Sequence, residues 1–189
     1  VKRQSGFLNP YIRDSKNLGS SITIPYYFVI SENKDFTLSP KLYADDKLVL
    51  HNEYRQKNKN SDHILDFSFN SINFFNSEKK SKSHFFAKSS FYPEFKNLND
   101  IKIESNFEKV SNDSYLKLHN FNSNLIQDTG LLNSYISLNG SKKNTTFDIS
   151  MEVYENLSKN KSDRYEFVYP NFLVSNNFDY ESSLIENIN

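Results

Sequence analysis

Strict alternation of apolar and polar residues is the feature of this 189-residue sequence that most restricts its fold. Successive side chains of a β-strand point to opposite faces of a sheet, so a repeat of two residues predicts strands rather than helices. The repeat is clearest where Phe147, Ile149, Met151 and Val153 are separated by mostly polar residues. Comparable runs occupy residues 22–30, 36–44, 48–55, 65–70, 84–91, 101–106 and 132–139.

Clusters of Asn, Asp, Ser and Lys separate these runs. Such side chains hydrogen-bond to their own backbone or tolerate left-handed conformations, so they favour turns. The sequence therefore predicts an all-β fold, an antiparallel meander of about ten strands of about 9–12 residues each. One connection, 109–129, is longer, and residues 112–116 within it are expected to begin a short turn of helix. The clusters lie at 13–17, 31–35, 45–46, 56–62, 76–83, 93–99, 140–144 and 156–163.

Two kinds of protein share this alternation. A soluble or surface-exposed β-sandwich, acting as a binding or adhesion module, would turn its apolar face to a core; a transmembrane β-barrel would turn that face to lipid. The predicted strands have the length that crosses a bilayer, whereas soluble strands average about 5–6 residues. The mean hydropathy is −0.70 and no 18-residue apolar run occurs, which excludes a spanning helix but not a spanning strand. Aromatic residues that would suit an interfacial girdle are Tyr26, Tyr27, Tyr43, Tyr54, Tyr92 and Tyr154.

The composition excludes several function classes. The 23 basic and 23 acidic residues cancel, which argues against a nucleic-acid-binding protein. The absence of cysteine excludes disulfides and thiolate metal sites, and the four glycines lie too far apart for a phosphate-binding loop. His51, His63, His84 and His119 lack metal-binding spacing, and no nucleophile motif occurs. We therefore expect no catalytic residue, metal or cofactor, and each histidine is expected to be an ordinary strand or loop residue.

Several short motifs, in order along the chain, resemble the start of the barrel of the LptD family of outer-membrane LPS-assembly proteins, also called organic solvent tolerance proteins. The motifs are RQSGFLNP at 3–10, PYYF at 25–28, LSPK at 38–41, EYR at 53–55 and, more loosely, VSNDSYL at 110–116 and Tyr169-Pro170. Three features depart from the family pattern. Lys41 replaces the usual arginine after Pro40, residues 11–13 replace a Ser-Phe-Gly segment, and the cysteines of many members are missing.

The resemblance implies a non-enzymatic protein of the Gram-negative outer membrane that transports and assembles lipopolysaccharide (LPS). Its implied partners are LPS, outer-membrane lipid, a plug lipoprotein like LptE and the periplasmic LPS-bridge proteins; nucleic acid and cofactors are not among them. Residues 1–189 would form a partial, unclosed barrel domain, without the periplasmic jellyroll and the remaining strands. The start at Val1 without a signal segment is what a chain cut from a larger barrel is expected to show.

Two sets of candidate site residues follow from the resemblance. The segment would carry the first-strand side of a lateral exit for LPS, and Pro10 and Pro25, on the first two predicted strands, would loosen that seam because proline lacks a ladder donor. Equally, both prolines would merely bend or end edge strands. The polar faces would line a hydrated lumen, or form a solvated wall without specific LPS contacts. The lumen candidates are the cations Lys41, Lys88 and Lys102 and the balancing anions Asp66, Asp148 and Glu152.

Overall fold

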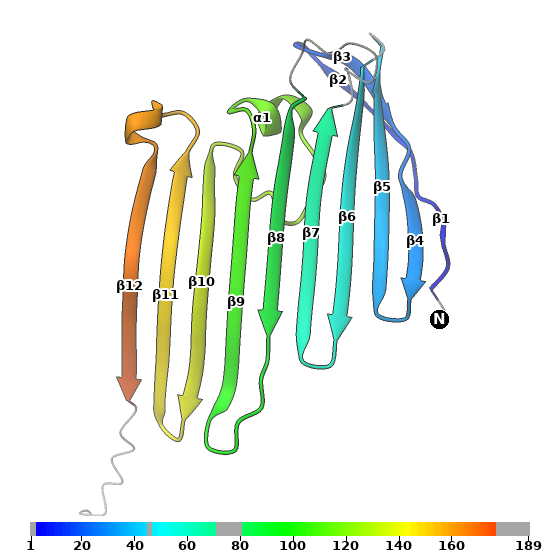
Figure 1. Ribbon diagram of the computed structural model, residues 1–189. Helices are drawn as coiled ribbons and strands as arrows, with labels where there is room; N and C mark the ends of the chain where they lie inside the picture. The colour runs from blue at the N-terminus through cyan, green and yellow to red at the C-terminus, as the bar shows by residue number, and fades with distance from the viewer. Residues whose placement is uncertain (1–2, 45–46, 71–80, 177–189) are drawn as a thin grey trace, which may run out of the picture.

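The computed structural model describes residues 3–44, 47–70 and 81–176, which form one open antiparallel sheet (Figure 1). Ten strands follow one another in the order β1-β4-β5-β6-β7-β8-β9-β10-β11-β12, and the hairpin β2-β3 joins this path through β5. The strands are β1 (Gly6–Phe7), β2 (Tyr11–Ser15), β3 (Gly19–Thr23), β4 (Tyr26–Ser31), β5 (Lys34–Tyr43), β6 (Leu48–Asn58), β7 (Ser61–Asn70), β8 (Ser83–Phe91), β9 (Asn99–Val110), β10 (Leu131–Lys142), β11 (Thr145–Asn156) and β12 (Tyr165–Asn176). The helical elements are α1 (Tyr115–His119) and the 3₁₀ turn η1 (Lys161–Asp163).

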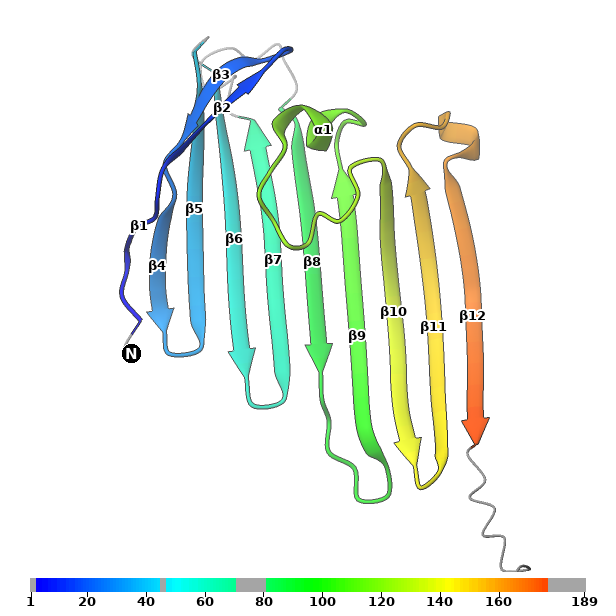
Figure 2. The same ribbon diagram turned by 180° about the vertical axis from the view of Figure 1, so that it is seen from behind.

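This architecture confirms the predicted all-β meander. From β5 to β12, each strand pairs antiparallel with the next and has 9 to 12 residues. The sheet is a single layer in both views, and no second sheet packs on it within the described residues (Figures 1 and 2). A β-sandwich requires such a second sheet, so this part of the chain is not a sandwich. The open sheet is consistent with part of a barrel.

The first hairpin departs from the prediction, which treated residues 22–30 as one continuous run. That prediction is wrong, because the run is divided between β3 and β4 at Ile24 and Pro25. β1 pairs with β4, β2 pairs with β3, and both β3 and β4 pair with β5. Proline has no N–H to donate to a ladder of hydrogen bonds. The pairing is therefore interrupted at Pro25, between β3 and β4.

The two faces of the sheet differ in chemistry. One face is apolar and exposed on nearly all strands from β4 to β12, because the apolar residue of each alternating pair points to it. The opposite face is polar on the strands. The connection 111–130 with α1 covers the upper part of β7–β9 on this face (Figure 2) and reaches β6 through Phe121, whose ring packs on His51. Exposed residues of the apolar face include Phe28, Ile30, Phe85, Phe91, Phe107, Ile136, Met151 and Phe172.

The main buried cluster lies beneath this connection rather than between two sheets. α1 forms within the predicted segment, and Tyr115 and Leu116 of α1 are 0% and 1% exposed. In the described part of the chain, no helix has the length and apolar character needed to cross a membrane. The cluster consists of Phe86, Val110, Tyr115, Leu116, Leu125, Leu132 and Leu157.

Gly140 allows two neighbouring strands to pack closely against β10. A Cβ atom at this position would lie 2.3 Å from Cδ1 of Ile101 and 2.5 Å from Cζ of Phe147. Gly140→Ala is therefore expected to lower the free energy of unfolding by about 1–3 kcal/mol, as overpacking usually does. The measurement is the urea midpoint followed by circular dichroism. Gly6→Ala is the matched control, because a Cβ there meets nothing within 4 Å; equal midpoints for the two variants would contradict the expectation.

Candidate functional site

Pro10 and Pro25 lie at one level of the sheet, between strands rather than within them. Leu8 to Pro10 separate β1 from β2, and Ile24 and Pro25 separate β3 from β4, so three residues lie opposite two. The Leu8 N–H donates to the Pro25 carbonyl oxygen at 2.9 Å, and the Ile24 N–H donates to the Pro40 carbonyl oxygen at 3.2 Å. The extra residue and the missing donors together interrupt the ladder at this point, as a bulge does.

The first strand is held weakly at the edge of the sheet. β1 pairs with β4 over only two residues, and Phe7 is 76% exposed. Side chains supply further attachment: Arg3 Nη1 lies 3.0 Å from Asp35 Oδ2, and the Ser5 Oγ accepts a 2.8 Å hydrogen bond from the Val29 N–H. An ion pair to Arg3, which is half exposed, adds little stability in water.

A hollow of about 360 Å³ lies beside these proline breaks on the polar face. Its lining includes Leu8 and Pro25 from the breaks, Arg55 and His51 from β6, and Asn122 from the connection 111–130. Arg55 donates to Asp35 at 2.7 Å, so its charge is partly compensated. The hollow therefore joins the first strands to the segment that covers the polar face.

All six lumen candidates fall on the polar face. Residues that lie opposite each other on paired strands point to the same face. The register places Lys88 in one row with Asn106, Tyr135 and Glu152. It places Lys102 in a second row with Asn139 and Asp148. The anion that pairs with Lys88 and Lys102 is Glu104, at 3.2 and 2.6 Å, and not one of the predicted anions. Glu104 was not among the predicted anions, because only the register places it next to both lysines.

The remaining polar-face candidates have different surroundings. Asp148 accepts a hydrogen bond from Asn139, and Glu152 accepts one of 2.5 Å from the Tyr154 hydroxyl. Lys41 and Asp66 are 6% and 0% exposed, because the connection 111–130 lies over them. Four of the six candidates therefore lie on the open polar surface, and two lie beneath a cover.

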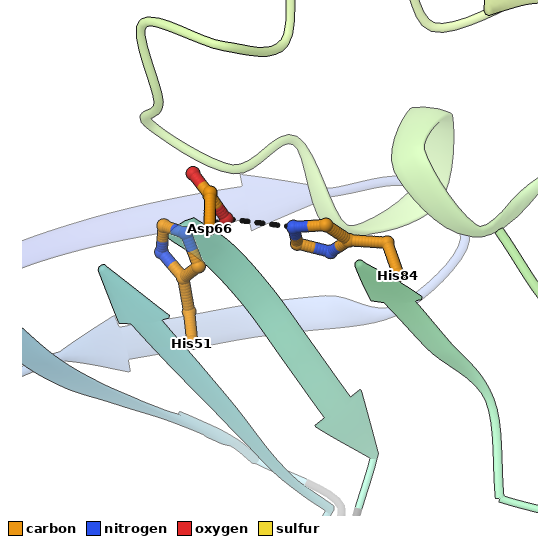
Figure 3. A group of neighbouring side chains, drawn as sticks. All are labelled: His51, Asp66 and His84. Atoms are coloured by element: carbon orange, nitrogen blue, oxygen red, sulfur yellow. Dashed lines mark hydrogen bonds and ion pairs between the residues drawn. The ribbon is translucent and has the colours of Figure 1, made fainter. Parts of the chain in front are cut away.

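Asp66 is the centre of a buried cluster that spans three neighbouring strands (Figure 3). His51 on β6 and His84 on β8 both direct Nε2 at Asp66 Oδ1, at 2.8 and 2.7 Å. The second oxygen, Oδ2, has no hydrogen bond of ordinary geometry, although the Ser123 side chain interacts with this carboxylate from the connection. A buried carboxylate oxygen without a full set of partners is costly unless something else binds it.

Hydrogen bonds and rings connect the cluster to α1. His84 Nδ1 lies 2.7 Å from the Ser68 Oγ, which lies 2.9 Å from the Tyr115 hydroxyl. The Phe121 ring centroid lies 4.9 Å from both the His51 and the His84 ring. Burial raises the pKa of Tyr115 to about 12, so its hydroxyl stays protonated, although the hydrogen bond with Ser68 acts in the opposite direction.

Sequence spacing gives no sign of this cluster. Metal-binding motifs place their ligands on one helix or loop, whereas these three residues come from three strands and meet only through the register. His51 lies directly opposite Ser68, and Ser68 lies opposite His84. The prediction that the histidines lie on strands or loops holds for His51, His63 and His84, while His119 ends α1.

His119 fixes the end of α1 against β5. Its Nδ1 lies 2.7 Å from the Tyr43 hydroxyl, and its backbone oxygen accepts a 2.5 Å hydrogen bond from Lys41 Nζ. Burial, together with the nearby positive charges of Lys41 and Lys82, lowers the pKa of His119 to about 4 from its ordinary value of 6.5. The folded protein therefore holds this imidazole neutral.

The pKa of His119 predicts that acid loosens α1. When α1 is released from the sheet, the His119 imidazole binds a proton below pH 6.5; when α1 is packed on the sheet, it does so only below about pH 4. The packing of α1 therefore loses stability as the pH drops through this interval, by at most about 3 kcal/mol. Amide exchange of Leu118 and Asn120, whose N–H groups bond within this turn, should therefore accelerate between pH 6.5 and 4 relative to a strand amide. His119→Gln should show a weaker pH dependence, and an identical profile for the two proteins would contradict the assignment.

Comparison with known proteins finds similarity to LPS-assembly proteins. No family model matches the chain. LPS-assembly protein LptD of Ralstonia nicotianae is 41% identical over 64 residues, which is 34% of this chain and 8% of that protein. LptD of Legionella pneumophila strain Paris is 29% identical over 140 residues, which is 67% of this chain and 16% of that protein. LptD of Pseudomonas aeruginosa is 34% identical over 68 residues, which is 36% of this chain and 7% of that protein. The aligned part thus covers less than a fifth of each relative. The matches agree with the resemblance seen in the motifs, and the chain is similar in sequence to segments of LPS-assembly proteins LptD.

Proposed function

We propose that this chain forms part of the wall of an outer-membrane β-barrel that transports and assembles lipopolysaccharide, without catalysis. The observation that carries this proposal is the single-layer sheet with one exposed apolar face and one polar face, in a sequence similar to proteins named for LPS assembly. The proposal includes the first-strand side of a lateral exit, through which LPS leaves the barrel sideways.

The apolar face supports contact with outer-membrane lipid. Large contiguous apolar surfaces are rare on proteins that stay in water, and here they extend across most of the sheet. Strands of 9 to 12 residues have the length that crosses a bilayer at a tilt. Backbone donors and acceptors of β1 and β12 remain free at the two edges of the described sheet, so a closed barrel needs further strands there.

The polar face supports a hydrated lumen that sugars and phosphates can enter. Lys88 and Lys102 are half-exposed on the open part of that face, and the buried carboxylate of Glu104 pairs with both. Lys41 and Asp66 would instead lie beneath the connection 111–130 and away from passing LPS. A plug lipoprotein like LptE and the periplasmic LPS-bridge proteins are the partners that this assignment implies.

The proline breaks support the lateral exit. Pro10 and Pro25 leave β1 attached to β4 by only two residue pairs, and the hollow of about 360 Å³ lies beside them. A ladder that is already interrupted opens at lower cost than a continuous one, because fewer hydrogen bonds must break.

Adjacent substitutions on β10 test which face meets lipid. Ile136, near the middle of the strand, is 52% exposed on the apolar face, and Ser137 points to the polar face. Ile136→Lys should destabilise the barrel by about 2–4 kcal/mol, the cost of a lysine at the bilayer midplane, and Ser137→Lys by much less. The measurement is the fraction of protein in the outer-membrane fraction that shows heat-modifiable gel mobility. Similar losses for both variants, or a wild-type protein soluble without detergent, would contradict the proposal.

Replacing the prolines tests the lateral exit. The double variant Pro10→Thr, Pro25→Thr restores two backbone donors and should tighten the seam, which lowers the amount of LPS that reaches the cell surface. Surface LPS is measured by labelling intact cells. Pro93→Thr, in the connection between β8 and β9, is the control for proline removal away from the seam. Unchanged surface LPS in the double variant, with normal protein levels, would refute the role of the prolines.

A further inference from the structure

The cluster of His51, Asp66 and His84 has the composition of a metal site. Two imidazoles and one carboxylate converge, and their ligand atoms all lie within 4.8 Å of one another (Figure 3). All three residues are buried, at 7%, 0% and 2% exposure. We propose that these side chains bind a divalent transition-metal ion of the zinc class, an inference that does not depend on the LPS function.

The donor atoms of all three side chains converge on one point. Nε2 of His51 and Nε2 of His84 both approach the same oxygen, Asp66 Oδ1, while Oδ2 lacks a hydrogen bond of ordinary geometry. An ion bound at about 2.0–2.1 Å holds tetrahedral ligand atoms roughly 3.3 Å apart, so the present separations of 2.8 and 2.7 Å need to widen by about half an ångström. The two Nε2 atoms, which lie within 4.8 Å of each other, would have to reach a similar separation.

The surroundings resemble the outer shell of a metal site. A histidine that binds a metal through Nε2 usually donates its Nδ1 proton to a second partner, which fixes the ring. His84 has that partner, because the Ser68 Oγ lies 2.7 Å from Nδ1 and is itself 2.9 Å from the Tyr115 hydroxyl. Glu53 lies directly opposite Asp66 in the register and adds a second carboxylate on the same face. The site thus offers negative charge to a dication.

The donor set selects the class of ion. Imidazole nitrogens suit Zn²⁺, Co²⁺, Ni²⁺ and Cu²⁺, whereas Mg²⁺ and Ca²⁺ prefer sites made of oxygen alone. Two histidines and one carboxylate leave a coordination position for a water molecule. The bound ion would join β6, β7 and β8 under α1, and the Ser68–Tyr115 contact would transmit this restraint to the connection 111–130.

The test uses the protein as its host makes it, extracted in detergent and stripped with a chelator. Co²⁺ is the probe, because its visible absorption reports binding and ligand geometry. We expect one Co²⁺ per chain, displaced by Zn²⁺ and unaffected by excess Mg²⁺. Zn²⁺ should also slow amide exchange in α1 relative to the chelated protein.

Variants locate the ion. Loss of an outer-shell partner weakens metal binding roughly 10–100-fold, and we expect an effect of that size for Ser68→Ala. We expect a larger loss of Co²⁺ affinity when a ligand itself is replaced, in His51→Gln, His84→Gln and Asp66→Asn. His63→Gln on β7, whose Nδ1 lies 3.0 Å from the Ser89 Oγ, is the matched control and should bind normally. Circular dichroism shows which variants fold, and the wild-type titration decides the matter if some do not. The proposal is overturned if the wild-type protein binds neither Co²⁺ nor Zn²⁺, or if folded variants of the three ligands bind as the wild type does. The three residues would then form only a hydrogen-bonded His–Asp–His cluster.

Discussion

The antiparallel register from β5 to β12 is the constraint on which the rest of this structure depends. It satisfies the backbone within one layer, so the sheet needs no second layer for its hydrogen bonds. It also aligns side chains across strands, and the alternating sequence therefore becomes two continuous faces of opposite chemistry. A sheet of this kind buries little of its own apolar surface, and its stability in water would be low. The proposed location in a bilayer removes that difficulty, because lipid covers the apolar face.

The connection 111–130 changes the polar face locally. Away from the connection, that face carries half-exposed polar groups, such as Lys88 on β8 and Lys102 on β9, which both pair with Glu104. Beneath α1, the same face carries His51, Asp66 and His84 with almost no exposure. Burial makes their mutual hydrogen bonds stronger and an incomplete set of partners more costly. The most unusual chemistry of the chain therefore lies where a short helix and its flanking loop cover the sheet.

The N-terminal strands show the opposite arrangement. There the ladder is interrupted at Pro10 and Pro25, and one extra residue on the first strand shifts the register by one. Such an interruption costs stability, and it lies at one edge of the sheet, while β5–β9 stay paired without a break. A wall that is continuously paired in the middle and interrupted at its first strands fits the proposed lateral exit.

The sequence by itself determined the fold class, the approximate positions of the long strands and the short helix after residue 112, because alternation and turn residues are local signals. Its short motifs also determined the resemblance to LptD. It also determined which side chains share a face along a single strand. Only the tertiary structure decided that the run 22–30 breaks at Pro25, that Glu104 pairs with Lys88 and Lys102, and that His51, Asp66 and His84 meet. These features depend on the register between strands and on where the connection 111–130 folds back, and both are set by contacts between residues that are distant in the chain.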